Sequence, residues 1–587
     1  MALIVQKYGG TSVGSVERIQ AVARKVRKTV AKGNAVVVVV SAMGNSTDTL
    51  VNLAKQISSS PSSREMDMLL STGEQVSIAL LSMALHELGQ AAISLTGAQV
   101  GIVTDAEHSR ARILKIKTER IQRHLELEEV VVVAGFQGIS TRDDREITTL
   151  GRGGSDTSAV ALAASLQAQE CQIYTDVDGI FTTDPRLVPS ARLMESITCD
   201  EMLELASLGA KVLHPRAVEI ARNYGVPLTV LSSYSDTLGT HVVSQVPKPR
   251  SLTGLEITKA VDGVEFQRNL AKVALLGVAD RPGVAANLFG EIARQGIDVD
   301  LIIQSIHEGN SNDIAFTVLT EDLDKAEAAA RKVFPEVEVK VDPFIAKVEI
   351  VGAGMIGRPG VAAQMFSTLA AAKINIQMIS TSEVKVSCVI HEQYCDGALA
   401  ALCRGYAVHN YTKTTTAPNE YLPVRGVALD HNQARLAIFG VPDISGMAAK
   451  IFGALADNKI SVDTIIQSQR CRAREGVDTR DIAFTVAQED AQKAKSALDY
   501  LAKTLDLEAI LIDDSIAKLS IVGAGMVAKP GVAARFFAAL AEGGINIQMI
   551  ATSEIKVSCV IAESEGKKAL EIVHDAFELN EGNCRLV

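Results

Sequence analysis

The C-terminal half of the chain repeats itself, and this repetition limits the possible folds more than any other feature of the sequence. The segment AKVALLGVADRPGVAANLFGEIARQGIDVDLIIQS, which starts at Ala271, matches ARLAIFGVPDISGMAAKIFGALADNKISVDTIIQS, which starts at Ala434. Gly277 in the first copy corresponds to Gly440 in the second, an offset of 163 residues (440 − 277). Self-similarity at a fixed spacing indicates a duplicated structural unit.

A second match shows that each unit consists of two related halves. VGAGMIGRPGVAAQMF, from Val351, matches VGAGMVAKPGVAARFF, from Val522, at an offset of 171 residues (522 − 351). INIQMISTSEVKVSCVI in the first copy likewise returns as INIQMIATSEIKVSCVI in the second. Within one unit, similar patterns open at Val273 and Val348, 75 residues apart (348 − 273). The C-terminal half therefore contains four consecutive modules.

Each module has the same predicted order of elements. A β-branched run ends near a glycine, a helix with apolar residues at helical spacing follows, and a strand such as INIQMI returns. A βαβ unit with a further hairpin and helix, about 70 residues long, is only marginally stable alone, so it should pair its sheet with a neighbour. We expect two tandem pairs: residues 253–420, with module 1 near 265–340 and module 2 near 341–415, and residues 425–587, with module 3 near 430–510 and module 4 near 511–587.

The first 245 residues contain no such repeat. Apolar strands, expected at residues 2–6, 35–41, 130–135 and 172–176, alternate with helical stretches, and this alternation is typical of an α/β domain. We therefore predict one α/β domain over residues 1–245. The proline-containing segments QVPKPRSL, at 245–252, and TTTAPNEYLPV, at 414–424, are the expected linkers.

Composition excludes several classes of protein. The 587 residues are 47% hydrophobic and 22% charged, with a net charge of −11 that is spread along the chain, which disfavours binding to nucleic acids or anionic membranes by bulk charge. No apolar run approaches the ~20 residues of a membrane span, and the N-terminus MALIVQKYGG lacks the pattern of a signal peptide. The eight cysteines contain no C-x-x-C pair, so we expect reduced thiols and a cytoplasmic location.

A glycine-rich turn follows the first expected strand. In KYGGTS, glycines let backbone N–H groups approach phosphate oxygens, the helix expected from Val16 supplies its N-terminal dipole, and Lys7 adds a mobile positive charge. The lysine precedes the glycines, so this is not the G-x-x-x-x-G-K-[ST] arrangement. Alone, the stretch is equally compatible with an ordinary strand-to-helix turn.

Two further segments have the composition of ligand-binding turns. TLGRGGSDTS leads into a helical run at 159–169, where Arg152 could hold a carboxylate and Ser155 could donate at the helix start. TDVDGIF with TTDPR follows a strand and is rich in acids and turn formers, which suits a nucleotide site. A capped helix and unliganded turn aspartates are the structural alternatives.

Together with STGE at residues 71–74 and AKVLHPRA, these motifs resemble, in this order, those of the aspartokinases of the amino acid kinase family. The four C-terminal modules resemble ACT domains, the amino-acid-sensing units of those enzymes, so the resemblance covers nearly the whole chain. It implies an N-terminal three-layer α/β sandwich followed by four ferredoxin-like α+β modules. Most such enzymes have two ACT domains, whereas this chain has four.

The resemblance also implies a reaction. An aspartokinase transfers the γ-phosphoryl group of ATP, with Mg²⁺ held mainly by the nucleotide phosphates, to the β-carboxylate of L-aspartate. The product, 4-phospho-L-aspartate, begins lysine, threonine and methionine synthesis. The resemblance further implies feedback inhibition by lysine, threonine or both. The edge strands of the modules favour a homo-oligomer, a dimer or higher. Because the acceptor carboxylate has a pKa near ~3.9, no general base is required.

The site residues carry over from the resemblance, position by position. The expected catalytic residues are Lys7, Glu74, Arg152 and Asp156. Glu74 would pair with the substrate ammonium and Arg152 with a substrate carboxylate, with hydrogen bonds from Thr47 and Ser155. ATP would contact Lys7, Gly9, Gly10, Ser41, Thr175, Asp176, Phe181, Asp184, Arg186 and Lys211. No protein metal ligand is expected, and His214 is as compatible with helix capping as with a site.

Effector residues carry over in two sets. The first is Asp280, Asp298, Asp300, Gln304, Asn375, Ile376, Ser382 and Glu383; the duplicate is Asp443, Asp463, Gln467, Asn546, Ile547, Ser553 and Glu554. Ser461 stands where the duplicate would match Asp298. The asparagines are unusual in apolar strands, because a buried amide needs partners, from a ligand or from backbone across the pairing.

Other functions are less compatible with the sequence. VGAGMIG fits the dinucleotide fingerprint G-x-G-x-x-G, but Pro359 follows and no strand-ending acid lies ~20 residues on, so NAD binding is disfavoured. A kinase for glutamate or a nucleoside monophosphate would lack the ACT array. A catalytically silent amino-acid sensor would have lost Lys7, Glu74, Arg152 or TDVDGIF, all of which are present.

Overall fold

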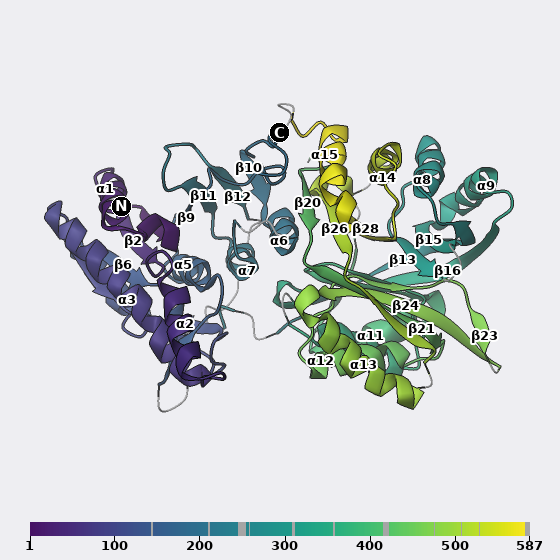
Figure 1. Cartoon of the computed structure of the whole chain (residues 1–587), viewed down its shortest axis with the longest axis horizontal. Coiled ribbons are helices and arrows are strands. Elements are labelled where there is room, and N and C mark those ends of the chain that lie inside the picture. Colours follow the sequence, from purple (N-terminus) through teal and green to yellow (C-terminus); the bar gives the residue numbers. More distant parts are fainter. Residues whose placement is uncertain are drawn as a thin grey trace. The chain divides into compact units, whose positions relative to one another are not determined.

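The computed structural model of the chain divides into two compact units (Figure 1). It describes residues 1–141, 145–208, 212–244, 254–256, 259–307, 311–355, 358–414, 422–474, 476–505, 507–527 and 529–580. Unit 1 comprises Met1–Phe181, Leu193–Ala206 and Ala210–Thr258; unit 2 comprises Thr182–Arg192, Ser207–Gly209 and Lys259–Val587. Unit 1 thus extends beyond residue 245, and the predicted linker at 245–252 lies outside the described residues.

Unit 1 is built on an eight-stranded sheet in the order β10-β12-β11-β9-β1-β2-β6-β3. Its strands are β1 (Leu3–Tyr8), β2 (Ala35–Val40), β3 (Ala92–Leu95), β6 (Val130–Ala134), β9 (Glu170–Thr175), β10 (Ser196–Thr198), β11 (Leu228–Ser232) and β12 (Thr240–Val243). The central strands are parallel, and β2 and β6 are valine-rich runs buried on both faces, as expected when helices cover a sheet from both sides.

Helices cover the two faces of this sheet. On one face, α1 (Val16–Val30) and α3 (Ser63–Glu87) pack on the outward side chains of β1, β2 and β6. On the other, the buried helix α5 (Gly154–Ser165) contacts β1, β2 and β9, and α7 (Pro215–Tyr224) packs on α5. The remaining helices of this part of the chain are α2 (Ser46–Ile57), α4 (Glu119–Glu126) and α6 (Cys199–Ser207). The predicted α/β layering is confirmed.

A smaller, four-stranded sheet completes unit 1, in the order β5-β4-β7-β8. Its strands are β4 (Ile102–Thr104), β5 (Ile113–Ile116), β7 (Gln137–Ser140) and β8 (Ile147–Thr149). Helix α3 packs against β8 as well as β3 and β6. Among the described helices, α3 alone is long and apolar enough to span a membrane, yet it contains the buried acids Asp67 and Glu74. The seven cysteines in the described ranges are free thiols.

Unit 2 contains two sheets between two rows of helices (Figure 1). The larger, eleven-stranded sheet contains β13 (Gly263–Ala279), β14 (Ile302–His307), β15 (Ser311–Leu319), β16 (Glu338–Val351), β17 (Met378–Thr381), β18 (Lys385–His391), β19 (Tyr411–Lys413), β20 (Gly426–Asp430), β26 (Ile516–Val522), β27 (Met549–Ser553) and β28 (Lys556–Ala562). The five-stranded sheet contains β21 (Gln433–Pro442), β22 (Ile465–Gln467), β23 (Arg472–Arg474), β24 (Val477–Ala487) and β25 (Ala509–Asp513).

The helices of unit 2 follow the module order. They are α8 (Val284–Arg294), α9 (Leu323–Val333), α10 (Val361–Ala371), α11 (Cys395–Tyr406), α12 (Met447–Asp457), α13 (Ala491–Leu505), α14 (Val532–Glu542) and α15 (Gly566–Ala576). Figure 1 shows α15, α14, α8 and α9 in one row and α11, α12 and α13 on the opposite side of the sheets. A third apolar cluster, which includes Ala274, Met378 and Met549, adds to the cores beneath the two rows.

The modules pair in a nested order, which corrects the expectation of two consecutive pairs. Module 1 joins module 4 through antiparallel pairing of β14 with β27 and through α8 against α14, where Phe289 and Phe537 lie 5.4 Å apart between ring centroids. Module 2 packs on module 3 through α10 and α12, with Phe366 and Phe452 also 5.4 Å apart. Each pair has its own hydrophobic core.

The long strands explain this arrangement. β13 and β16 run through modules 1 and 2 without a break and pair along most of their length, so these two modules share a sheet end to end. The pairing of β13 with β16 does not cover the edges of strands β14 and β17 or the helices α8 and α10. Exposed strand edges and apolar helix faces favour partners, and the second duplicated unit provides both.

One predicted strand begins later than expected. In INIQMI, Ile374 completes the end of α10, because its N–H donates to Leu369 O at 3.0 Å and Lys373 adopts a positive φ of 58°. β17 starts only at Met378, and β27 correspondingly at Met549. The asparagines therefore lie in the connection before the strand, where Asn375 is exposed and Asn546 is half-buried.

Candidate active site

The predicted site residues of unit 1 gather at the carboxyl ends of the central parallel strands. β1 lies between β2 and β9, and the chain continues to opposite sides of it, so this is the point where the strand order reverses. In open α/β sheets ligands bind outside such a point. Gly9 and Gly10 follow β1, Ser41 follows β2, and Thr175 ends β9.

The glycine turn after β1 is locked to the turn after β2. A side-chain Cβ on Gly10 would lie 2.9 Å from the carbonyl oxygen of Ala42, so only glycine fits there. The N–H of Gly44 donates to Gly10 O at 3.0 Å. The two turns therefore form one rigid edge, from which backbone N–H groups can face a phosphate.

Lys7 is oriented by an acid on a buried helix. Its Nζ lies 2.7 Å from Oδ1 of Asp156, and the two side chains are only 13% and 12% exposed. Asp156 lies in the first turn of α5, after Gly153, whose φ of 69° is left-handed. The lysine charge is thus held beside a helix N-terminus, an arrangement that favours an anionic ligand.

Glu74, on α3, is a buried acid with an unused oxygen. Its Oε1 accepts the N–H of Ala42 at 3.0 Å, whereas Oε2 has no hydrogen-bond partner in the described part of the chain. Burial raises the pKa of Glu74 from 4.5 to about 7, because the charged form loses water. A ligand cation would fill the position beside Oε2 and favour the ionised form.

Arg152 provides the opposite charge. It lies between Gly151 and Gly153, is exposed, and has no ion pair within the described ranges. Ser155 follows on α5 and is buried against Gly135, where a Cβ would lie 2.9 Å from Ser155 Oγ. Thr47 occupies the first turn of α2 and is half-buried. Glu74, Arg152, Ser155 and Thr47 comprise a carboxylate, a guanidinium and hydroxyls, the groups that would suit an amino acid.

The remaining proposed nucleotide residues are less closely grouped than those at the ends of β1, β2 and β9. Asp176 is exposed beside Thr175, whose Oγ1 donates to it at 3.1 Å, and Phe181 is half-buried. Asp184 and Arg186 pair with each other at 2.6 Å in the segment Thr182–Arg192, which belongs to unit 2. Lys211 lies outside the described residues. No cluster of His, Cys, Asp and Glu that could hold a metal ion occurs in the described ranges.

Several contacts at this edge have no counterpart in the sequence predictions. Tyr8 and Tyr174 stack with centroids 4.5 Å apart, and Asp178 anchors a turn by accepting from Ser235 Oγ at 2.7 Å. His214 caps α7, since its Nδ1 accepts the N–H of Arg216 at 3.3 Å. The AKVLHPRA motif predicted that helix start. No sequence motif indicated the tyrosine stack or the turn at Asp178.

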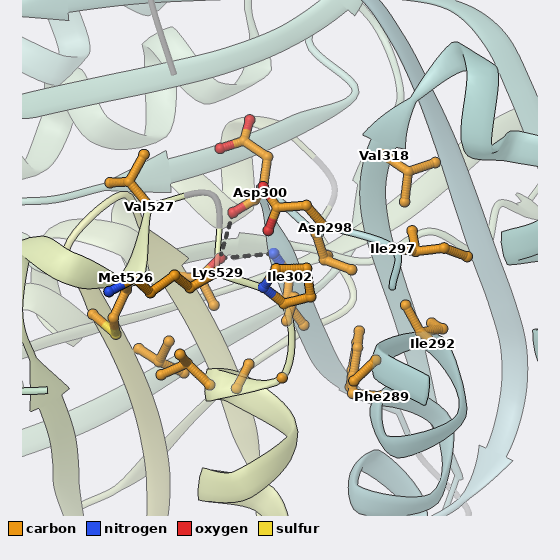
Figure 2. A pocket seen from close by; sticks show the side chains of 18 of the residues that line it. Phe289, Ile292, Ile297, Asp298, Asp300, Ile302, Val318, Met526, Val527 and Lys529 are labelled. Atoms are coloured by element: carbon orange, nitrogen blue, oxygen red, sulfur yellow. Dashed lines mark hydrogen bonds between the residues drawn. The ribbon is translucent and has the colours of Figure 1, made fainter. Parts of the chain in front are cut away.

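Pockets lie between the paired modules of unit 2, and four of them are lined by described residues that bear on the effector predictions. Figure 2 shows one between modules 1 and 4, where Phe289, Ile292 and Ile297 of module 1 face Met526, Val527 and Lys529 of module 4. Its polar lining includes Asp298, Asp300, Ser553 and Glu554, together with Gln267, Lys529 and Thr552. Burial and the charge of Asp300 raise the pKa of Asp298, while Asp300 pairs with the buried Lys347 at 2.6 Å.

A related pocket lies between modules 2 and 3. It is lined by Ser382 and Glu383 of module 2 and by Ser461 and Asp463 of module 3. Asp463 pairs with Lys518, as Asp300 does with Lys347. The two pockets differ where Ser461 replaces the acid that Asp298 supplies.

The other two pockets contain the asparagines. Asn546 donates to Oδ1 of Asp280 at 2.8 Å, and Gln304 donates to the carbonyl of Ile547 at 2.7 Å. Asn375 donates to Oδ1 of Asp443 at 3.2 Å, in a pocket that Ile376 and Gln467 also line.

The two effector sets named from the sequence are therefore regrouped. Residues of module 1 face residues of module 4, and residues of module 2 face residues of module 3. The asparagines find carboxylates of the partner module rather than backbone groups.

Comparisons with known proteins agree with this architecture. The amino acid kinase family model matches residues 2–232, and ACT domain models match residues 272–334, 348–406, 436–500 and 519–577. The aspartokinase of Geobacillus stearothermophilus is 53% identical over 408 residues, which cover 70% of this chain and 98% of that protein. Aspartokinase 2 of Bacillus subtilis is 53% identical over 395 residues, 67% of this chain and 94% of that protein.

A solved structure matches the entire chain. The crystal structure of aspartate kinase from Synechocystis is 60% identical, with a TM-score of 0.89 and complete coverage of both chains. The part of this chain that the two curated relatives do not cover thus also has a counterpart in a solved structure.

Proposed function

This chain belongs to the aspartokinases, phosphotransferases of the amino acid kinase family with a carboxyl acceptor, and we propose that it transfers the γ-phosphoryl group of ATP to the β-carboxylate of L-aspartate. The product is 4-phospho-L-aspartate, the first intermediate of lysine, threonine and methionine synthesis, made in the cytoplasm. The observation on which this rests most is the buried Glu74, whose Oε2 has no hydrogen-bond partner among the described residues, on the same unit as the exposed Arg152.

The two charges match the α-substituents of the acceptor. The α-ammonium of aspartate would bind Oε2 of Glu74, and the α-carboxylate would bind Arg152 through paired N–H groups. Ser155 and Thr47 would add hydrogen bonds. Once both α-groups are held, the β-carboxylate is the one nucleophile left free, and it is already ionised near neutral pH.

Phosphoryl transfer then depends on positioning and on neutralising charge. Lys7, held by Asp156 at 2.7 Å, would face the transferring phosphoryl group, with the glycine-turn amides and the N-terminus of α5 beside it. Mg²⁺ on the nucleotide phosphates would supply additional positive charge. Lys7 and Asp156 act without a proton transfer, consistent with an acceptor that needs no general base.

Trapping of the acyl phosphate with hydroxylamine tests the reaction. ATP-dependent hydroxamate should form with L-aspartate and not with L-glutamate, whose side chain is one methylene longer. Equal turnover of glutamate would indicate a different acceptor, and no turnover with either, in protein shown to be folded, would favour an amino-acid sensor.

We also propose that lysine, threonine or both bind the pockets between paired modules and inhibit the enzyme. Carboxylates such as Asp280, Asp298 and Asp443 would receive an effector ammonium, and Asn375 and Asn546 would bind its carboxylate. Hydroxamate assays with each amino acid, alone and combined, test this. Aspartate turnover that neither effector suppresses would leave the kinase and remove the proposed regulation.

A further inference from the structure

The last described residues of unit 1 form a bend that is hydrogen-bonded to the edge of its smaller sheet. Residues 254–256 run beside β5: the N–H of Leu255 donates to Leu114 O at 3.1 Å, and the N–H of Glu256 donates to Ile113 O at 2.9 Å. Tyr224, at the end of α7, donates its hydroxyl to Gly254 O at 3.3 Å. Unit 2 resumes at Lys259, so this segment is the chain's exit from unit 1.

The segment brings a carboxylate into the interior. Glu256 is 2% exposed, and its Oε1 accepts from Arg216 Nε at 2.6 Å. Its Oε2 accepts from Arg216 Nη2 at 2.8 Å and from the N–H of Ile113 at 2.6 Å. This two-point contact uses the planar fork of the guanidinium, which holds the arginine in one orientation.

Arg216 has a second set of contacts on the opposite side of its guanidinium. Its Nη1 donates to the carbonyl of Leu150, and its Nη2 donates to the carbonyl of Ala111 at 2.7 Å. Leu150 immediately precedes Gly151 and Arg152 in the loop of the candidate site. The Glu256–Arg216 pair is therefore hydrogen-bonded to the first residue of the loop that contains Arg152.

That loop depends on such contacts for its position. Gly151 and Gly153 have positive φ values of 79° and 69°, and glycine alone does not select one conformation. A Cβ at Gly153 would overlap the ring of His214, at 2.1 Å, so the loop lies directly on the start of α7. On the other side, Thr149 Oγ1 donates to the buried Asp67 at 2.6 Å.

We infer that Glu256 is a positioning residue for the acceptor site: through Arg216 and the carbonyl of Leu150, it sets the loop so that Arg152 meets the α-carboxylate of the substrate. This inference rests on the proposed function, since it concerns the carboxylate that Arg152 would bind. It gives the AKVLHPRA motif a role, because His214 supports the loop from below and Arg216 holds its first carbonyl. Glu256 itself touches no substrate.

The test replaces Glu256 with glutamine in the full chain. Glu256→Gln keeps the shape but removes the charge that orients Arg216, so the KM for L-aspartate should rise roughly tenfold, as expected for a misplaced binding group. The KM for ATP should not change. The α-amide of aspartate lacks the α-carboxylate charge, so its Ki as a competitor of aspartate should change much less than the KM for aspartate.

A matched control lies on the same helix. Arg222 of α7 pairs with Asp200 of α6, so Asp200→Asn removes another carboxylate–arginine pair of the same helix, one that is more exposed than the Glu256–Arg216 pair. This variant should leave the KM for aspartate and the Ki for the α-amide unchanged. Equal loss of aspartate affinity in Asp200→Asn would show that general destabilisation of α7 is the cause.

A second variant keeps the inference testable if Glu256→Gln does not fold. Arg216→Lys retains a charge for Glu256, but a single ammonium cannot also hold the carbonyls of Leu150 and Ala111. It should produce the same separation between KM for aspartate and Ki for the α-amide. If both ligands weaken by the same factor in the folded variants, the inference is overturned. Failure of the proposed function is distinguishable, because the unmodified protein would then not phosphorylate aspartate.

Discussion

The substitution Glu74→Gln should raise the stability of the protein relative to wild type more at alkaline pH than at acidic pH. It should also abolish aspartate binding. Burial raises the pKa of Glu74 from 4.5 to about 7 in the folded protein. The folded state therefore prefers the protonated form of Glu74. The contribution of Glu74 to stability is fully present below pH ~4.5 and is lost as the pH rises through about 7. Glutamine mimics the protonated acid at every pH and can still accept the N–H of Ala42 through its side-chain oxygen.

The magnitude follows from the raised pKa. One pKa unit corresponds to about 1.4 kcal/mol, so ionising Glu74 in the folded protein costs about 3 kcal/mol once the pH is well above 7. Between pH 5 and pH 8 the wild type should lose about 2 to 3 kcal/mol relative to the variant. For a unit of this size that is a relative change in Tm of about 5 to 10 °C. The glutamine NH₂ is unpartnered at both pH values, so its cost cancels in the comparison.

Scanning calorimetry of the full chain at pH 5 and pH 8 measures this difference, on the transition that shifts when ATP is added. Glu87→Gln, an exposed position at the end of the same helix, is the control and should show no pH-dependent difference from wild type. A Tm difference between Glu74→Gln and wild type that is the same at both pH values would refute the argument. Aspartate should raise the wild-type Tm and leave that of Glu74→Gln unchanged.

Three further outcomes are expected. The kcat/KM for aspartate should fall about tenfold from pH 8 to pH 6, because only ionised Glu74, with its pKa of about 7, binds the ammonium; a flat pH profile would contradict this. Lys7→Ala should lower kcat by ~10²-fold or more with an unchanged circular dichroism spectrum, since it removes charge from the phosphoryl position. Asn546→Ala, which loses the 2.8 Å bond to Asp280, and Asn375→Ala should each weaken inhibition by lysine or threonine several-fold in effector titrations, with the uninhibited rate preserved.

Local structure in this protein could be predicted from sequence motifs, whereas contacts between distant residues could not. The glycines at 9, 10 and 153 occupy positions that their spacing suggested, because a turn between strand and helix is a local structure. The Glu256–Arg216 pair was not predictable, since the two residues lie 40 positions apart and Glu256 follows an expected linker. The partner of Glu74 Oε1 is a backbone N–H, which every residue except proline possesses, so no residue type marks it.

The pairing of the modules was predicted incorrectly for a different reason. Sequence repeats show which segments have the same fold, but they do not show which modules pack together, because all four modules have similar sequences. The choice depends on β13 and β16, each of which passes through two modules as one strand. A strand of 17 residues was not distinguishable from two shorter strands in the sequence, because the polar residues Gln267, Arg268 and Asn269 interrupt its apolar pattern where the pairing with β16 shifts register.

The nested order of the modules has a consequence for synthesis on the ribosome. Modules 2 and 3 are neighbours in the chain, whereas about 240 residues separate β14 from its partner strand β27. At ~5 to 20 residues per second, synthesis of this stretch takes on the order of 10 to 50 seconds. Throughout that interval the nascent chain displays the edge of β14 and the apolar face of α8. Exposed apolar surface and unpaired strand edges make a nascent chain prone to aggregation, so production of this enzyme should depend on chaperones more than that of a chain whose modules pair in sequence order.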